Sequence, residues 1–223
     1  MKSILFSLIK AVNEEDLIEC KAITKNIRTI LVLPFTFPVE KNLDEVSLDF
    51  FKPNGRHYEK YLGQLELLGI EKSKVKSINP YETNREEINN LLNVSDAIFI
   101  PGGNPEMFMT LAIRLNIVDL LTNYKGVIIG ESAGSVLQFD FYPLTAQNNF
   151  YGTNSYYNGF NAIKMDFVLD VHTQDTDDYK DSLKKLSQMK DKNIISIYDG
   201  GYIIYDRAVN SYQTYGKVVK FDM

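Results

Sequence analysis

The chain has 223 residues, of which 44% are hydrophobic and 24% are charged, and this composition is typical of a globular protein with an apolar core. The formal net charge of -5 excludes a strongly basic surface, so we expect no nucleic acid partner. No apolar run approaches the about 20 residues that cross a bilayer, so we expect no membrane partner. The one cysteine, Cys20, cannot form an internal disulfide, which favours a cytoplasmic protein.

Buried strand patterns alternate with amphipathic segments through residues 1–135. This alternation predicts an α/β fold, a three-layer sandwich in which helices cover both faces of a mostly parallel, doubly wound sheet. The predicted strands are Ser3–Leu8, Thr29–Pro34, Lys74–Ile78, Ala97–Ile100 and Gly126–Ile129. The segments whose apolar residues have helical spacing are Glu14–Asn26, Arg56–Leu68, Arg85–Leu92 and Glu106–Leu121.

The remainder of the chain contains one polar segment followed by shorter elements. Thr145–Gly159 is rich in Asn and Tyr without a clear period, and we predict a long loop, of a kind that is often functional. Phe167–Val171 is predicted as a strand and Asp178–Met189 as a helix. A small antiparallel C-terminal extension is predicted from the short strands Ile194–Tyr198, Tyr202–Tyr205 and Lys217–Phe221. No linker interrupts these elements, so we expect a single domain over residues 1–223.

One apolar strand ends at a Gly-x-Ser-x-Gly turn, which is centred on Ser132. Small residues on both sides of a serine let the backbone turn sharply from strand to helix, and this turn lifts the hydroxyl above the sheet edge. The same small residues also occur where a helix simply packs close to a strand. Open parallel sheets bind ligands at the carboxyl ends of their strands, and Pro101-Gly102-Gly103-Asn104-Pro105 follows the preceding strand. Both features therefore indicate one site.

A serine nucleophile needs a base, usually an imidazole that is oriented by a carboxylate. Of the two histidines, His57 starts a predicted helix, whereas His172 directly follows the strand Phe167–Val171. His172 is therefore the candidate base. Asp199 follows the strand Ile194–Tyr198 and is the candidate carboxylate, although a tight Asp-Gly-Gly hairpin turn explains this residue equally well.

The oxyanion that forms during acyl transfer needs amide donors. The N–H of Ala133, directly after the serine, faces the space above the hydroxyl if the turn is a true elbow. Gly103 can supply the second amide, because Gly102 and Gly103 have no side chains that keep a ligand away from the backbone. A structural explanation of the same turn, with Asn104 as helix N-cap and Pro105 as first helical residue, is compatible with this role. We expect Gly102 and Asn104 to contact the substrate.

Acidic residues surround the predicted site. Glu131 precedes the serine, and we expect it to be exposed there and to shape the substrate pocket. Three further acids, Asp175, Asp177 and Asp178, follow His172, and most of this cluster is expected to be structural. Within it, Thr176 or Asp177 is predicted to cap the next helix.

The ordered set of motifs is Ile100-Pro101-Gly102-Gly103-Asn104, Gly130-Glu131-Ser132-Ala133-Gly134-Ser135, Asp170-Val171-His172 and Tyr198-Asp199-Gly200-Gly201. In this order the motifs resemble the peptidase E family of serine peptidases. That family includes aspartyl dipeptidases and the related cyanophycinases, and it has the fold of class I glutamine amidotransferases. The resemblance implies Ser132 as nucleophile, His172 as general base, and Gly103 and Ala133 as oxyanion donors.

The resemblance leaves the acid of the site to be chosen between two positions. Cyanophycinase-like members use an acid on a later strand, which corresponds to Asp199. Peptidase E itself places the acid between serine and histidine, where this chain has only Gln147, Asn148 and Asn149. We therefore choose Asp199.

The sequence thus predicts a serine peptidase that hydrolyses short peptides through an acyl-enzyme, without a cofactor or a metal. Aspartyl dipeptidases are expected to hold the substrate's acidic side chain with arginine near the histidine, but here that segment is acidic and Lys180 is its nearest cation, which argues against Asp-X specificity. One alternative is a non-catalytic, amidotransferase-like binding or regulatory module. Another is an esterase-type serine hydrolase, although that class orders its acid before its histidine. The sequence is compatible with a homodimer.

Overall fold

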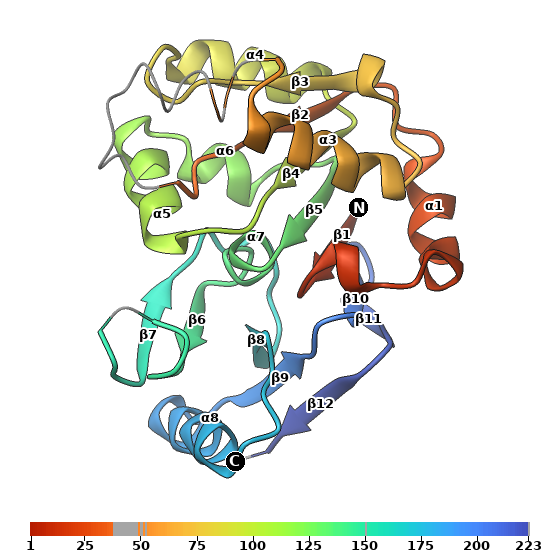
Figure 1. The fold of residues 1–223 in the computed structure, drawn as a ribbon. Helices are drawn as coiled ribbons and strands as arrows, with labels where there is room; N and C mark the ends of the chain where they lie inside the picture. The colour runs from red at the N-terminus through yellow and green to blue at the C-terminus, as the bar shows by residue number, and fades with distance from the viewer. Residues whose placement is uncertain (38–48, 50, 52, 150, 223) are drawn as a thin grey trace.

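The structure is a computed structural model that describes residues 1–37, 49, 51, 53–149 and 151–222 (Figure 1). Its largest element is a seven-stranded sheet with the strand order β11-β10-β1-β5-β4-β2-β3. Five strands pair in parallel, namely β1 (Lys2–Phe6), β5 (Val127–Glu131), β4 (Ala97–Ile100), β2 (Ile30–Val32) and β3 (Val75–Ser77). The other two, β10 (Tyr202–Asp206) and β11 (Ser211–Tyr215), pair antiparallel along the edge of β1. The predicted mostly parallel sheet is confirmed.

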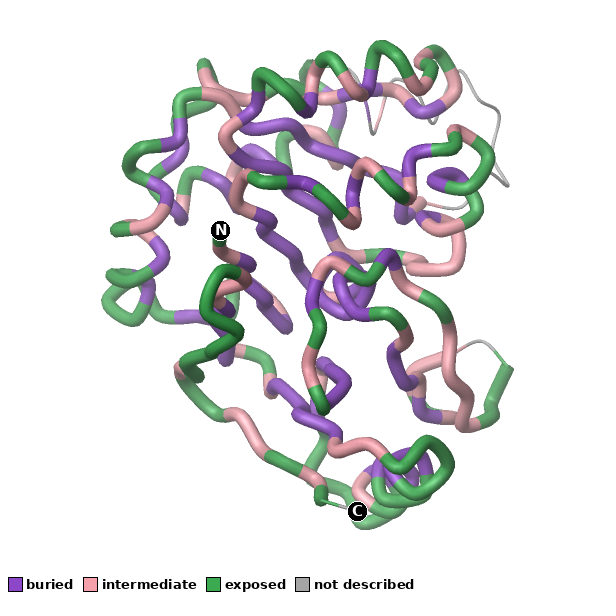
Figure 2. The backbone as a smooth tube through the Cα atoms, turned by 180° about the vertical axis from the view of Figure 1, so that it is seen from behind, coloured by how far each residue is buried: buried purple, intermediate pink, exposed green. Residues whose placement is uncertain are grey.

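Helices cover both faces of this sheet. Side chains alternate along β1, so that Ile4 and Phe6 enter one hydrophobic core and Leu5 enters the other. The first core is covered by α1 (Ile18–Thr24) and α3 (Arg56–Leu67). The second core is covered by α4 (Arg85–Val94), α5 (Pro105–Arg114) and α6 (Val118–Thr122). Figure 2 shows the buried strands between the more exposed helices, which is the predicted three-layer arrangement.

A smaller sheet lies below the main sheet in Figure 1 and has the order β12-β9-β8. The strands β8 (Phe167–Val171) and β9 (Asn193–Ile197) are parallel, and α8 (Asp177–Lys190) connects them. The antiparallel partner of β9 is β12 (Val218–Phe221). The antiparallel extension therefore exists, but it is divided between two sheets, because β10 pairs with β1 while β9 pairs with β8.

Three details of the predicted elements differ from the structure. The helix predicted over Glu106–Leu121 is two helices, α5 and α6, because Asn116 adopts a positive φ of 53° between them. The segment Thr145–Gly159 contains β7 (Ser155–Asn158), which pairs with β6 (Phe141–Leu144), while residue 150 lies outside the described residues. The helix predicted over Glu14–Asn26 is a 3-10 turn, η2 (Glu14–Leu17), followed by α1.

Two further 3-10 turns are η1 (Ile9–Ala11) and η4 (Lys72–Lys74). Of the two predicted candidates for the N-cap of α8, Thr176 and Asp177, the cap is Thr176, whose hydroxyl accepts a hydrogen bond from the Tyr179 amide at 3.4 Å. Among the described residues, no helix has the length and apolarity needed to span a bilayer.

Candidate active site

Ser132 occupies a strained turn between β5 and the short helix α7 (Ala133–Val136). Its φ of 51° and ψ of -112° lie in a region that non-glycine residues rarely adopt, and such strain concentrates at functional sites. Glycine is required on both sides of the turn. A Cβ on Gly130 would overlap the carbonyl oxygen of Gly134, and a Cβ on Gly134 would overlap the carbonyl oxygen of Ile100. The Gly-x-Ser-x-Gly sequence thus produces a sharp strand-to-helix turn with the serine at its tip.

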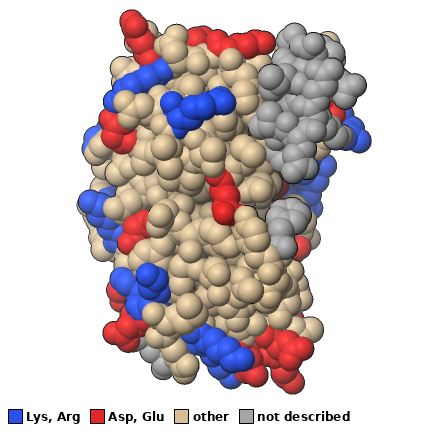
Figure 3. Space-filling model, turned by 90° about the vertical axis from the view of Figure 1, so that its left-hand side faces the viewer, with Lys and Arg blue, Asp and Glu red and all other residues tan. Residues whose placement is uncertain are grey.

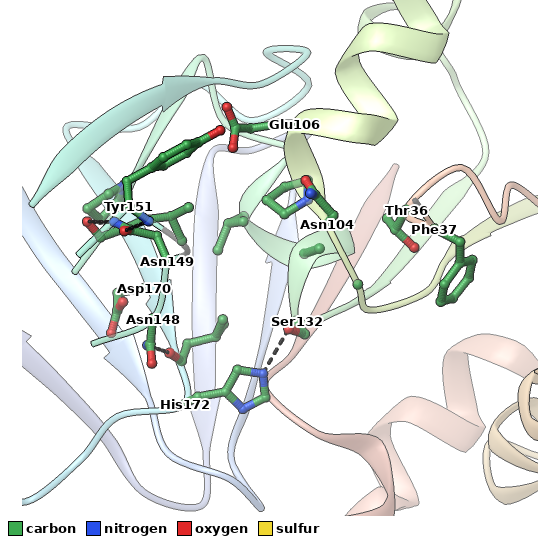
Figure 4. A pocket seen from close by; sticks show the side chains of 17 residues that line it. Thr36, Phe37, Asn104, Glu106, Ser132, Asn148, Asn149, Tyr151, Asp170 and His172 are labelled. Carbon is green, nitrogen blue, oxygen red and sulfur yellow. Dashed lines mark hydrogen bonds between the residues drawn. The ribbon is translucent and has the colours of Figure 1, made fainter. Parts of the chain in front are cut away.

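His172 lies directly after β8 and reaches the serine from the smaller sheet (Figure 4). Its Nε2 is 2.7 Å from Ser132 Oγ, and its Nδ1 is 2.7 Å from Asp199 Oδ1. Asp199 belongs to a turn in which the Gly201 amide donates to the Tyr198 carbonyl at 2.9 Å. The tight turn and the carboxylate contact therefore occur together, but the turn is not the hairpin that the sequence offered as an alternative, because β9 and β10 pair with other strands in different sheets. A hydroxyl, an imidazole and a carboxylate form one continuous hydrogen-bonded chain.

Ser7 is a fourth member of this chain that sequence reasoning missed. It directly follows β1 and is fully buried. Its hydroxyl donates to Asp199 Oδ1 at 2.7 Å and accepts a hydrogen bond from the His172 amide at 2.9 Å. The available signal was a small polar residue near the carboxyl end of an apolar strand, the place where open α/β sheets bind their ligands.

The two predicted oxyanion donors line the same cleft as Ser132. Neither the Gly103 amide nor the Ala133 amide makes a hydrogen bond with another described residue. Gly103 has a φ of 141°, and a Cβ there would lie 2.5 Å from the Thr36 carbonyl oxygen. The next amide, of Asn104, donates to that same oxygen at 2.6 Å, which fixes the loop. Backbone packing on Thr36 therefore fixes the loop at Gly103, and the amides of both Gly103 and Ala133 have no hydrogen-bond partner among the described residues.

The Gly-Gly-Asn turn also has the predicted structural role of starting a capped helix. Asn104 caps α5, with its Oδ1 accepting from the Met107 amide at 3.1 Å, and Pro105 is the first helical residue. Asn104 and Gly103 line the cleft, whereas Gly102 lies behind the serine and is not part of the lining. A Cβ on Gly102 would lie 3.2 Å from the Ser132 Cβ, so glycine lets this loop pack against the elbow.

The expectation that Glu131 is exposed is wrong. Glu131 is 3% exposed, and it does not line the cleft. Its Oε2 accepts from the Ile9 amide at 3.1 Å and from Gln64 Nε2 at 2.6 Å, so the carboxylate ties η1 and α3 to the elbow from inside. Burial raises the pKa of Glu131. The sequence position beside a strand-end serine gave no sign that α3 would supply a buried amide partner.

The cleft has a volume of about 750 Å³ and is formed by residues from both sheets and from the β6–β7 hairpin. Its described lining is Thr36, Phe37, Gly103, Asn104, Pro105, Glu106, Ser132, Ala133, Val136, Pro143, Leu144, Asn148, Asn149, Tyr151, Asp170, Val171 and His172. This lining includes two acids but no lysine or arginine. On the side of the molecule that carries α5 and the hairpin, basic side chains lie toward the edges and most of the centre is uncharged (Figure 3).

Asp170 is the more deeply buried of the two lining acids. It is 2% exposed, and its Oδ2 accepts hydrogen bonds from the Tyr179 hydroxyl, at 2.7 Å, and from the Ser196 hydroxyl. Burial raises the pKa of Asp170 to about 6 against the opposing effect of these donors. Asn148, one of the residues at the alternative acid position, donates to the Tyr179 hydroxyl at 3.1 Å rather than to His172.

The other histidine lies away from this hydrogen-bonded chain. His57 belongs to the first turn of α3, and its ring centroid is 5.5 Å from that of Phe37. No group of three or more His, Cys, Asp or Glu side chains in the described part of the chain could hold a metal ion.

An open α/β sheet with a serine at a strand-to-helix turn is a scaffold that hydrolases use. The model of peptidase family S51 matches residues 55–209, which is more than half of the chain. The chain therefore belongs to peptidase family S51 and is a serine-type peptidase, in agreement with the resemblance to peptidase E. No curated protein matches the chain.

Two solved structures share the fold at low sequence identity. A candidate peptidase E protein from Listeria monocytogenes EGD-e is 18% identical, with a TM-score of 0.62, and the match covers 100% of this chain and 98% of that protein. A peptidase from an acI-B1 Actinobacterium is 15% identical, with a TM-score of 0.55, over 99% of this chain and 96% of that one. At these identities the likeness supports the fold alone.

Proposed function

We propose that this protein hydrolyses short peptides through an acyl-enzyme, with Ser132 as nucleophile, His172 as general base and Asp199 as the acid that orients the imidazole. The observation that carries the proposal is the continuous chain from Ser132 Oγ to His172 Nε2 to Asp199, with both links at 2.7 Å. Such short contacts let a proton leave the hydroxyl as the oxygen attacks.

In the proposed first step, Ser132 Oγ forms a bond to the carbonyl carbon of the scissile peptide while its proton moves to His172 Nε2. The oxygen of that carbonyl gains the negative charge, and the Gly103 and Ala133 amides donate to it. The C–N bond then breaks, the leaving nitrogen takes the proton from His172, and an ester to Ser132 remains. Water attacks this ester by the same route and restores the free hydroxyl.

Asp199 has two tasks in this scheme. Its Oδ1 accepts from His172 Nδ1, which keeps Nε2 free to take the serine proton, and its charge stabilises the imidazolium. The side chains of His172 and Asp199 are 37% and 50% exposed, so burial alone does not hold this pair in place. Ser7 is proposed as the positioning residue that fixes both, through its contacts with the Asp199 carboxylate and the His172 amide.

The alternatives have less support. A non-catalytic binding module needs no contact between serine and histidine, yet the two side chains are within hydrogen-bond distance. An esterase of the α/β-hydrolase type orders its acid before its histidine, whereas Asp199 follows His172 along the chain and contacts it directly. Neither alternative is favoured by a specific contact.

Labelling with a fluorophosphonate probe tests the proposal. The probe phosphonylates a serine only when the hydroxyl is activated, so we expect one adduct on Ser132 by intact mass and peptide mapping. Ser132→Ala should abolish labelling. Ser155 is a partly buried serine in β7 that does not line the cleft, so Ser155→Ala should label like the wild type. A folded wild-type protein that stays unlabelled while a control serine hydrolase reacts would overturn the proposal.

A further inference from the structure

The cleft beside Ser132 has a carboxylate that the proposed chemistry does not use. Glu106 lies in the first turn of α5 and lines the cleft. Its side chain makes no hydrogen bond or ion pair with any described residue, unlike Asp170, whose Oδ2 already accepts two hydroxyl donors. The positive end of the α5 dipole favours an acid at this position but leaves the carboxylate oxygens free to accept further hydrogen bonds.

Three tyrosines of the β6–β7 hairpin stand near this carboxylate. Tyr142 and Tyr157 stack with ring centroids 6.0 Å apart, and Tyr157 and Tyr151 stack at 6.4 Å. Burial, and to a smaller extent the negative charge of Glu106, raises the pKa of both Tyr142 and Tyr157. Tyr151, the outermost ring, is 63% exposed and lines the cleft, and Figure 4 shows its ring extending toward Glu106.

This pairing of a free carboxylate with an exposed aromatic ring suits a cation. An ammonium or guanidinium group is attracted to the face of a tyrosine ring and to a carboxylate at the same time. The described lining has no basic side chain that competes for Glu106, and Asp170 is a second acid in the same lining. An acidic substrate side chain would meet repulsion from both carboxylates.

We propose that Glu106 and Tyr151 form a subsite for a basic side chain, so that the preferred substrates are short peptides that carry lysine or arginine next to the scissile bond. This inference rests on the proposed peptidase function, because it assigns the substrate class to the same cleft. A free peptide N-terminus is a second source of an ammonium group, and blocked peptides distinguish the two sources.

Turnover of matched peptides tests the subsite. N-acetylated peptides that differ only in lysine, norleucine or glutamate at the residue before the scissile bond separate charge from chain length. We expect kcat/KM to follow the order lysine, norleucine, glutamate. Glu106→Gln should lower the value for lysine peptides about fivefold and leave norleucine peptides almost unchanged. Glu106→Lys should invert the preference in favour of glutamate.

Glu86→Gln is the matched control, because Glu86 occupies the first turn of α4, is exposed and lies outside this cleft. It removes the same charge from an equivalent helix position, and we expect wild-type selectivity. If Glu86→Gln and Glu106→Gln lose lysine selectivity equally, the selectivity depends on the net charge of the protein and not on a local contact, and the subsite is overturned. Equal kcat/KM for lysine and norleucine in the N-acetylated series, with a higher value for both peptides when the N-terminus is free, would instead assign the ammonium site to the peptide terminus and also overturn the subsite.

Binding to Ser132→Ala separates this inference from the proposed chemistry. Calorimetric titration of this variant with the same three peptides needs no turnover. Tighter binding of the lysine peptide, weakened by the added Glu106→Gln change, supports the subsite even if no peptide is hydrolysed by the wild type. Equal binding of all three peptides overturns the subsite, even if the wild type cleaves them through Ser132.

Discussion

The hydroxyl of Ser7 lies 2.7 Å from Asp199 Oδ1, so the end of β1 in the main sheet holds the carboxylate that follows β9 in the smaller sheet. The same hydroxyl accepts from the amide of His172, whose φ of 60° is unusual for a non-glycine residue. One buried hydroxyl thereby connects the two half-exposed side chains on which the proposed proton transfer depends.

Ser7→Ala should reduce kcat about tenfold to 100-fold, because a hydrogen bond to a charged group contributes about 1.5–3 kcal/mol. KM should change little, since Ser7 does not line the cleft. Ser3→Ala is the control, because Ser3 lies on the same strand and is fully buried, and its hydroxyl has no partner among the described residues. Steady-state kinetics of both variants check this prediction, and equal kcat values in the two would contradict it.

Asp199→Asn should lower kcat about 100-fold or more, because the amide can neither hold the productive tautomer of His172 nor stabilise its positive charge. The control is Asp191→Asn, at an exposed position with a φ of 52° that asparagine also tolerates. Pre-steady-state acylation rates provide the measurement. If Asp199→Asn acylates at the wild-type rate, the acid has been assigned to the wrong residue.

Asp170 should make the stability of the protein depend on pH. Its pKa is raised from 3.8 to about 6 in the folded state, so folding favours the protonated form. Between these two values the folded protein binds more protons than the unfolded chain, and stability from this group falls as the pH rises. The loss is complete above about pH 6 and amounts to roughly 3 kcal/mol.

Asp170→Asn removes this titration while keeping an oxygen that accepts from Tyr179 and Ser196. The difference in unfolding free energy, wild type minus variant, should therefore fall by roughly 3 kcal/mol between about pH 3.5 and about pH 7. Urea unfolding at several pH values provides the comparison. Parallel stability curves for the two proteins would refute the assignment of this pH dependence to Asp170.

Much of the architecture was predictable because local sequence determines it. The strands β2 and β4 are wholly buried apolar runs, as expected of parallel strands covered on both faces. The contact between His172 and Ser132 was expected because open parallel sheets place their sites at the carboxyl ends of strands, and β5 and β8 both end at the cleft. The N-cap Asn104 was also predicted, and the N-cap Thr176 was narrowed to two adjacent residues, since a capping side chain bonds to an amide only a few positions away.

The missed features depend on contacts between distant segments. The partner of Asp199 in the hydrogen-bonded chain, Ser7, is 192 positions away in sequence, and Gln64 meets Glu131 across 67 positions. Pairing between strands was equally unreadable, because the pattern of β9 and β10 predicts two strands without showing that each joins a different sheet. A polar residue inside an apolar segment signals that a partner exists but does not identify it.

Turnover of a dipeptide and tripeptide library by the wild type and by Ser132→Ala is the most direct test of Ser132 as the nucleophile. The mutation removes the proposed nucleophile at the surface of the cleft, and we expect little change in stability because Ser132 Oγ forms a hydrogen bond only with His172 among the described residues. We expect the folded variant to lose all measurable hydrolysis of every peptide that the wild type cleaves. Equal hydrolysis by both proteins would contradict this expectation.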